Sequence, residues 1–378
     1  MTVLDESSRQ YDLPLPPTLT PARLTELATH AVSNPEGKTI STTAPYTGTP
    51  LGDLPLATKE TVEDAFGRAK NAQAGWADTP ISERKKIMLR FHDLVLARQA
   101  EALDLMQAEN GKTRRDAFLE IADTAITARY YACNAERFLH PVRRRGAVPV
   151  LTRTTELHHP KGIVTIISPW NYPLSMAAGD AVPALMAGNV VVQKPDTQTA
   201  LTALWALGLM REAGLPADVW QMVVGHGSEI GDTLLDGADF VMFTGSTASG
   251  RRIASGAGER LIRAALELGG KNPMIVLDDA DLDRTIAGAV AGCFPSGGQL
   301  CVSIERIYAP DARFDEFVDR FAAATRALTI GAAYDYSMEM GSLTTPSQLK
   351  TVTEHVDDAV SKGAKVVVGG AARPPPRA

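Results

Sequence analysis

The sequence predicts an α/β fold in which a doubly wound parallel sheet is followed by a second, incomplete α/β unit. Short apolar runs rich in β-branched residues alternate with helical stretches through the middle of the chain. These runs end in Gly, Pro, Ser or charged residues, as parallel strands do where ligands bind at their carboxyl ends. The chain has 378 residues, of which 44% are hydrophobic, so two or three domains are expected.

The first part of the chain divides into an arm and a helical region. Residues 1–57 are rich in Pro and Thr and predict an N-terminal arm that leads into turns and a hairpin. From about 58 to 140 the pattern is helical, with Thr61 as a candidate cap. The apolar positions at helical spacing are Val62, Ala65, Phe66 and Ala69. A bridging hairpin is expected near 141–160.

Strand-like runs define the predicted sheet. They are GIVTIIS, GNVVVQKP, WQMVVGHG, DFVMFTGS and NPMIVLDD. We expect a Rossmann-like nucleotide-binding domain over 58–266 and a catalytic domain over 267–378. The run AKVVVGG also resembles a strand, but the following AARPPPRA holds three prolines, which can neither continue a helix nor join a central strand.

Two glycine turns are candidate phosphate-binding sites. GHGSEIG begins at Gly225 and departs from the GxGxxG spacing, so by itself it is better explained as an ordinary strand-to-helix turn. FTGSTASG follows one strand later, where Gly245 allows close approach to the backbone and Ser246 can donate a hydrogen bond. Lys194 ends another strand, and alone it would be a surface lysine. Together, the turns favour a bound nucleotide.

Glu267 and Cys301 are the candidate catalytic pair. Glu267 precedes a glycine turn in ELGGKNP, and Cys301 follows two glycines in GGQLCVSIER. A carboxylate can act as a general base and a thiolate as a nucleophile, and the glycines give a substrate access to both. A lone cysteine is usually a small buried apolar residue, but this context favours a reactive one.

Charge and composition limit the partners. The net charge is −6, which gives no field for a nucleic acid or an anionic membrane. The N-terminus lacks a secretory pattern and no long apolar run occurs, so a cytoplasmic protein is expected. The three cysteines have no CxxC or histidine spacing, so neither disulfides nor a metal site is expected.

The motifs SPWNYP, KPDT, FTGSTASG, ELGGKNP and GQLC, in this order, resemble those of the aldehyde dehydrogenase superfamily from about residue 40 to 370. The central region is most similar to the succinate-semialdehyde dehydrogenase branch. The resemblance implies the aldehyde dehydrogenase fold and oxidation of a small aldehyde to the carboxylic acid. It makes Cys301 the nucleophile, with the Asn171 amide and the Cys301 N–H holding the oxyanion, and Glu267 the base that clears the thioester.

The resemblance also implies a dinucleotide cofactor. With Gly225 of the first glycine turn, the residues expected along it are Trp170, Asn171, Lys194, Pro195, Asp196, Thr197, Gly245, Ser246 and Leu268. Many NAD-selective members carry Glu where Thr197 stands. A neutral side chain does not repel a 2′-phosphate, so NADP is the expected cofactor and NAD the alternative.

The substrate and the activity are less defined. Members of the succinate-semialdehyde branch carry an Arg for the substrate carboxylate where this chain has Gly179 and Asp180, so another arginine would have to serve. Ser303 stands where some relatives have a second, redox-active Cys. The family's E-[IE]-F-G-P segment is not found before Ala378, so a C-terminal truncation is expected, and full-length members are homo-oligomers. A remnant that only binds nucleotide is the main alternative; a cysteine hydrolase is weaker, because no His lies near Cys301 in sequence.

Overall fold

The computed structural model describes residues 13–34, 37–148 and 150–372. The first twelve residues of the expected arm and most of the proline-rich end lie outside these ranges. The helices are α1 (Pro21–Ala28), α2 (Lys59–Asp78), α3 (Ile81–Ala97), α4 (Gln99–Asn110), α5 (Arg114–Leu139), α6 (Pro173–Met186), α7 (Ala200–Glu212), α8 (Gly227–Asp236), α9 (Thr247–Glu259), α10 (Leu282–Cys293), α11 (Phe314–Arg326) and α12 (Pro346–Ser361). Short 3-10 turns are η2 (Thr197–Thr199), η3 (Pro295–Gly298) and η4 (Asp311–Arg313).

The strands are β1 (Thr39–Thr43), β2 (Pro50–Pro55), β3 (Val142–Arg144), β4 (Thr154–Glu156), β5 (Ile163–Ile167), β6 (Val190–Lys194), β7 (Trp220–Met222), β8 (Phe240–Gly245), β9 (Arg263–Leu268), β10 (Asn272–Ile275) and β11 (Ile304–Tyr308). The main sheet is parallel throughout, in the order β7-β6-β5-β8-β9. The chain moves outward from β5 to β7 and then crosses to β8, so the order reverses between β5 and β8. The predicted doubly wound fold is confirmed, and such a switch point is where this fold binds ligands.

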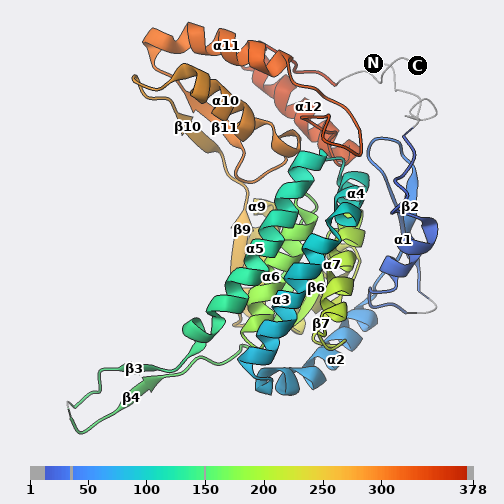
Figure 1. Ribbon diagram of the computed structural model, residues 1–378, viewed down its shortest axis with the longest axis vertical. Helices are drawn as coiled ribbons and strands as arrows, with labels where there is room; N and C mark the ends of the chain where they lie inside the picture. Colours follow the sequence, from blue (N-terminus) through green and yellow to red (C-terminus); the bar gives the residue numbers. More distant parts are fainter. Residues whose placement is uncertain (1–12, 35–36, 149, 373–378) are drawn as a thin grey trace.

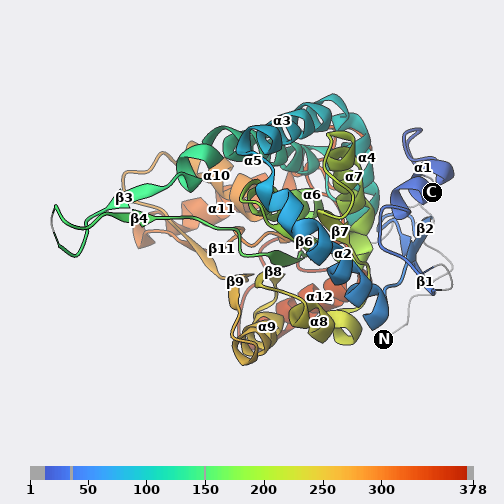
Figure 2. The ribbon, with the colours of Figure 1, turned by 90° about the horizontal axis from the view of Figure 1, so that it is seen from below.

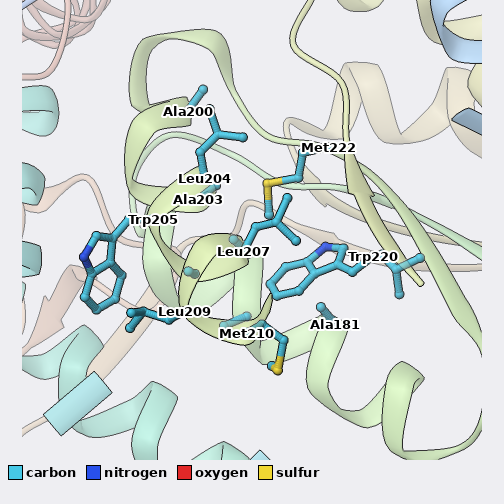
Figure 3. Packing of buried hydrophobic residues seen from close by; sticks show 14 of the residues in the cluster. Ala181, Ala200, Ala203, Leu204, Trp205, Leu207, Leu209, Met210, Trp220 and Met222 are labelled. Atoms are coloured by element: carbon cyan, nitrogen blue, oxygen red, sulfur yellow. The ribbon is translucent and has the colours of Figure 1, made fainter. Parts of the chain in front are cut away.

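Helices cover both faces of the main sheet. α6 and α7 lie on one side, with α3 and α5 beyond them, and α8 and α9 lie on the other (Figure 2). The largest buried side chains of the core include Trp205 on α7 and Trp220 on β7 (Figure 3). The Trp220 indole N–H donates to the side-chain oxygen of Gln193 at 2.9 Å, so its polar atom is satisfied inside the core.

Two expectations about elements are wrong, and one strand was missed. β9 was not anticipated, because RAALEL is rich in helix-forming residues; pairing with β8 overrides that preference. NPMIVLDD does not extend the main sheet but forms β10, which pairs with β11 in a separate two-stranded sheet. AKVVVGG forms no strand in the described part of the chain, and Val366 and Val367 remain 47% and 45% exposed.

The start of α2 shows how local chemistry fixes a helix end. The N-cap is Thr58 rather than the expected Thr61, and Thr61 completes a capping box with it from the third helical position. The predicted apolar stripe is confirmed. Its members Val62, Ala65, Phe66 and Ala69 are all buried.

Smaller units flank the main sheet (Figure 1). β1 and β2 pair antiparallel beside α1, a helix not expected in the arm. β3 and β4 pair antiparallel and project away from the rest of the molecule. α10 and α11 pack on β10 and β11 around a second core of Val276, Leu282, Ile286, Ala289 and Phe317. Within the described ranges, every helix is too short or too polar to cross a bilayer.

Candidate active site

The predicted site residues, apart from Cys301, gather at the carboxyl end of the main sheet. Trp170 and Asn171 follow β5, Lys194 ends β6 and Gly225 follows β7. Gly245 ends β8 and Leu268 ends β9, each beside its candidate partner Ser246 or Glu267. The carboxyl ends of parallel strands share one edge, so residues far apart in sequence are brought to one edge of the sheet.

A pocket of about 340 Å³ opens at the ends of β6 and β7. Four predicted cofactor residues line it, namely Lys194, Asp196, Thr197 and Gly225. Residues 40–42 of β1 close another side, although no binding role was expected for the arm. The hydroxyl-rich run TISTT was the available signal. Trp170, Asn171, Gly245, Ser246 and Leu268 do not line this pocket but lie along the same edge of the sheet.

Lys194 is the cation of this pocket. It is 8% exposed, and its Nζ donates to the neighbouring Pro195 carbonyl at 3.2 Å. Burial lowers the pKa of Lys194, while the nearby Asp196 acts in the opposite direction. An ammonium has three donors, so the group retains capacity for an oxygen-rich ligand.

The chain around Thr197 is fixed by its neighbours. The Gln198 amide donates to the backbone carbonyls of Thr43 and Glu109, both at 2.9 Å. The Asp196 carboxylate accepts from the Gln198 N–H at 3.0 Å and caps η2. The wall that carries Thr197 is therefore held by the arm and by the end of α4.

The turn into α9 is capped, and two of its glycines leave no room for a side chain. The Ser246 hydroxyl accepts the N–H of Ser249 at 3.2 Å and caps the helix. A Cβ added at Gly245 would lie 2.6 Å from the Phe243 ring. A Cβ added at Gly250 would lie 2.5 Å from the side chain of Leu268, which shows how closely α9 packs on β9.

Cys301 lies in a loop after η3 and is an exposed, free thiol. The preceding turn is left-handed, with φ of 50° at Ser296, 65° at Gly297 and 77° at Gly298. The Asn171 side-chain amide donates to the Gln299 carbonyl at 2.9 Å, two residues before the thiol. The structure therefore brings the loops of two predicted catalytic residues together.

Asn272 holds the other side of the same loop. Its amide donates to the Cys301 carbonyl at 2.6 Å and to the Ser303 carbonyl at 2.8 Å. Asn272 belongs to the motif that contains Glu267, but no role was predicted for it. The segment that follows Glu267 is thus tied to the loop that carries Cys301, a candidate nucleophile.

Glu267 is exposed near the end of β9, and its charge acts on Asp180 of α6. Burial and the Glu267 carboxylate together raise the pKa of Asp180 to about 6. α6 begins directly after the loop that carries Asn171, so Glu267 lies across from the same element. Close convergence of Glu267 and Cys301 on one carbon remains a prediction.

The fold and this edge define an α/β protein with a nucleotide-binding type of sheet and a thiol-bearing loop beside it. The chain belongs to the aldehyde dehydrogenase family, whose model matches residues 32–378.

Its relatives agree with this assignment. A protein of Mycolicibacterium smegmatis, named provisionally as an NADP(+) succinate-semialdehyde dehydrogenase, is 48% identical over 87% of this chain. The mitochondrial succinate-semialdehyde dehydrogenase of Oryza sativa subsp. japonica is 35% identical over 89% of it. This chain spans 64% of the length of each of these relatives.

Solved structures share the fold. An aldehyde dehydrogenase of Brucella melitensis biovar abortus superposes with a TM-score of 0.87 at 34% identity, over 91% of this chain and 71% of that one. Betaine aldehyde dehydrogenase of Staphylococcus aureus, solved with NAD+, superposes with a TM-score of 0.87 at 29% identity. The match covers 92% of this chain and 72% of that one.

Proposed function

We propose that this chain carries the machinery to oxidise an aldehyde to its carboxylic acid with NADP+, through a thioester on Cys301. The observation that supports this most is the hydrogen bond from the Asn171 amide to the Gln299 carbonyl, because it brings an oxyanion-type donor to the thiol loop. The name of the mycobacterial relative supports NADP+ as the cofactor.

The residues of the pocket fit such a cofactor. Lys194 is a buried cation with one backbone partner, and the neutral Thr197 stands beside it. A phosphate or ribose hydroxyl would satisfy the remaining donors of Lys194. NADP+ supplies the acceptor for the hydride that leaves the substrate carbon.

The chain's own residues perform the other steps. The Cys301 sulfur bonds to the aldehyde carbon, and the carbonyl oxygen becomes an oxyanion. The Asn171 amide and the Cys301 N–H donate to that oxygen. Such donors act strongly because they are already in place when the charge develops; losing one typically costs about 100-fold or more in rate.

Glu267 completes the cycle. Once hydride has left, the carbon is held as a thioester on Cys301. Glu267 accepts a proton from water as the water oxygen bonds to that carbon, and the carbon–sulfur bond breaks. The products are a carboxylic acid and the free thiolate.

We propose succinate semialdehyde as the substrate, on the names of the relatives. Asp180 is the residue that argues against this substrate, because it stands where the branch is expected to have an arginine for the substrate carboxylate. The charge of Glu267 also acts on Asp180. An aldehyde that lacks the distal carboxylate, such as butanal, is the informative comparison.

The test is formation of NADPH from NADP+ and succinic semialdehyde, followed by absorbance. Cys301→Ser should abolish it, whereas Cys133→Ser, which alters another exposed thiol, should not. Binding of NADP+ without turnover would favour the nucleotide-binding remnant. Ester hydrolysis without cofactor would not discriminate, since a reactive thiol can catalyse it in either case.

A further inference from the structure

We propose that Lys112 and the buried first turns of α5 form a clamp that positions the nucleophile loop against the Asn171 amide. We call Lys112, Asp116 and Glu120 the α5 clamp. They are 0%, 4% and 0% exposed, and none belongs to the motifs that predicted the site. Their catalytic consequence rests on the proposed function, but their geometry does not.

Asp116 holds the nucleophile loop. Its Oδ2 accepts the backbone N–H of Ser296 and the hydroxyl of Thr113, both at 2.9 Å. Ser296 is 1% exposed and has a φ of 50°, a conformation that residues other than glycine rarely adopt. Such a backbone persists only where its surroundings fix it. The Asp116 carboxylate provides that fixation at the first residue of the left-handed turn.

Glu120 and Lys112 hold the other loop. One Glu120 oxygen accepts the N–H groups of Leu174 and Ser175 at 2.8 and 3.1 Å, in the first turn of α6. Its second oxygen accepts the Lys112 ammonium at 2.5 Å. Lys112 also donates to the backbone carbonyl of Asn171 at 2.7 Å. The Asn171 backbone is thus anchored by the cation while the helix after it is anchored by the acid.

Tyr172 links the two halves. The Lys112 ammonium lies 3.9 Å from the centre of the Tyr172 ring, and the Tyr172 hydroxyl is 3.3 Å from the Ser296 hydroxyl. Asp116 and Glu120 are four residues apart, so they lie on one face of α5. A single helix face therefore fixes both loops, and the contact of Asn171 with the Gln299 carbonyl spans the space between them.

This arrangement makes the clamp a set of positioning residues. Polar groups buried this completely are retained only with their partners satisfied, and here the partners are the two loops themselves. A displacement of about 1 Å in a reacting group can cost about 100-fold in rate. Removing a clamp carboxylate should therefore lower kcat more than it raises the KM of the aldehyde.

The experiment compares three variants by steady-state kinetics and amide hydrogen exchange. Asp116→Ala removes the acceptor, Asp116→Asn retains one acceptor oxygen, and Asp123→Ala alters an exposed acid on the same helix. We expect Asp116→Ala to lower kcat about 10- to 100-fold with KM changed about twofold at most. Exchange should quicken in both loops, 168–175 and 294–303. Asp116→Asn should restore most of kcat and most of the protection of the two loops. Asp123→Ala should match the wild type in both measurements.

Other results would overturn the clamp. An unchanged kcat, loosening of one loop only, or faster exchange throughout the chain would each show that Asp116 does not couple the loops. If the wild type has no turnover, the proposed function fails and hydrogen exchange alone decides the clamp. If Asp116→Ala does not fold, Tyr172→Phe, which removes the link to Ser296, should still quicken exchange in both loops; no change would reject the proposal.

Discussion

Among single residues, Thr197 bears on the choice of cofactor. It lines the pocket beside Lys194 and is neutral. Thr197→Glu should lower the ratio of kcat/KM for NADP+ over NAD+ at least about tenfold, because a carboxylate repels a 2′-phosphate and can accept ribose hydroxyls. Thr197→Ser is the matched control and should keep the ratio of the wild type. An unchanged ratio in the Glu variant would show that the phosphate lies elsewhere.

Asp180 should make stability depend on pH. Burial and the nearby Glu267 raise its pKa from the usual 3.8 to about 6. A carboxyl whose pKa is raised in the folded state stabilises the folded protein below about pH 4. That stabilisation is lost as the pH rises to about 6, because the carboxyl then ionises in its buried position. Relative to the wild type, Asp180→Asn should gain on the order of 1–2 kcal/mol between these pH values, measured by urea unfolding. An equal pH dependence in both proteins would contradict this.

At the scale of elements, the cap of α9 fixes the turn at Gly245, a candidate cofactor residue. Ser246→Ala removes the acceptor for the Ser249 N–H and should cost about 1 kcal/mol of unfolding free energy. The KM for NADP+ should rise as well, since the turn at Gly245 loses its anchor. Ser255→Ala, on the exposed side of the same helix, is the control and should change neither. A Ser246 variant as stable as that control would show that the cap is not needed.

Elements were predicted correctly where the pattern of apolar residues and the residues of the following turn indicated the same structure. β5, β6, β7 and β8 were found because buried apolar runs ended in recognisable turns. β9 was missed because its composition favours a helix and only its neighbour β8 makes it a strand. AKVVVGG was predicted as a strand from its composition but forms none, because a strand also needs a neighbouring strand to pair with.

The candidate site follows the same pattern, although its residues remain predictions. The glycine turns suggested Gly225, Gly245 and the loop of Cys301 as candidates. Lys112, Asp116 and Glu120 were missed because their role lies in contacts with residues at least 50 positions away. The four-residue spacing of the two acids after a lysine was the available signal, and alone it is typical of a solvated helix face.

For the whole molecule, stability should be uneven. The main sheet shares its core with the surrounding helices, whereas the second core rests on two strands and two helices. None of the described residues of α12 is buried, and Val352 and Val360 are 43% and 47% exposed. Local unfolding is least costly where few apolar contacts are broken.

Hydrogen exchange should therefore differ between helices. Amides of α12 should exchange on the order of 100-fold faster than those of α6, which is buried against the main sheet. Mass spectrometry of peptic fragments measures both helices in one sample. Equal protection would mean that α12 is covered in solution.

The most direct measurement of the central claim is the intact mass of Glu267→Gln after incubation with NADP+ and succinic semialdehyde. If Cys301 is the nucleophile and Glu267 the base, this variant should release a single equivalent of NADPH and retain a succinyl group on Cys301, located by peptide mapping. Turnover at the wild-type rate, no retained acyl group, or a succinyl group on Cys133 or Cys293 would contradict it.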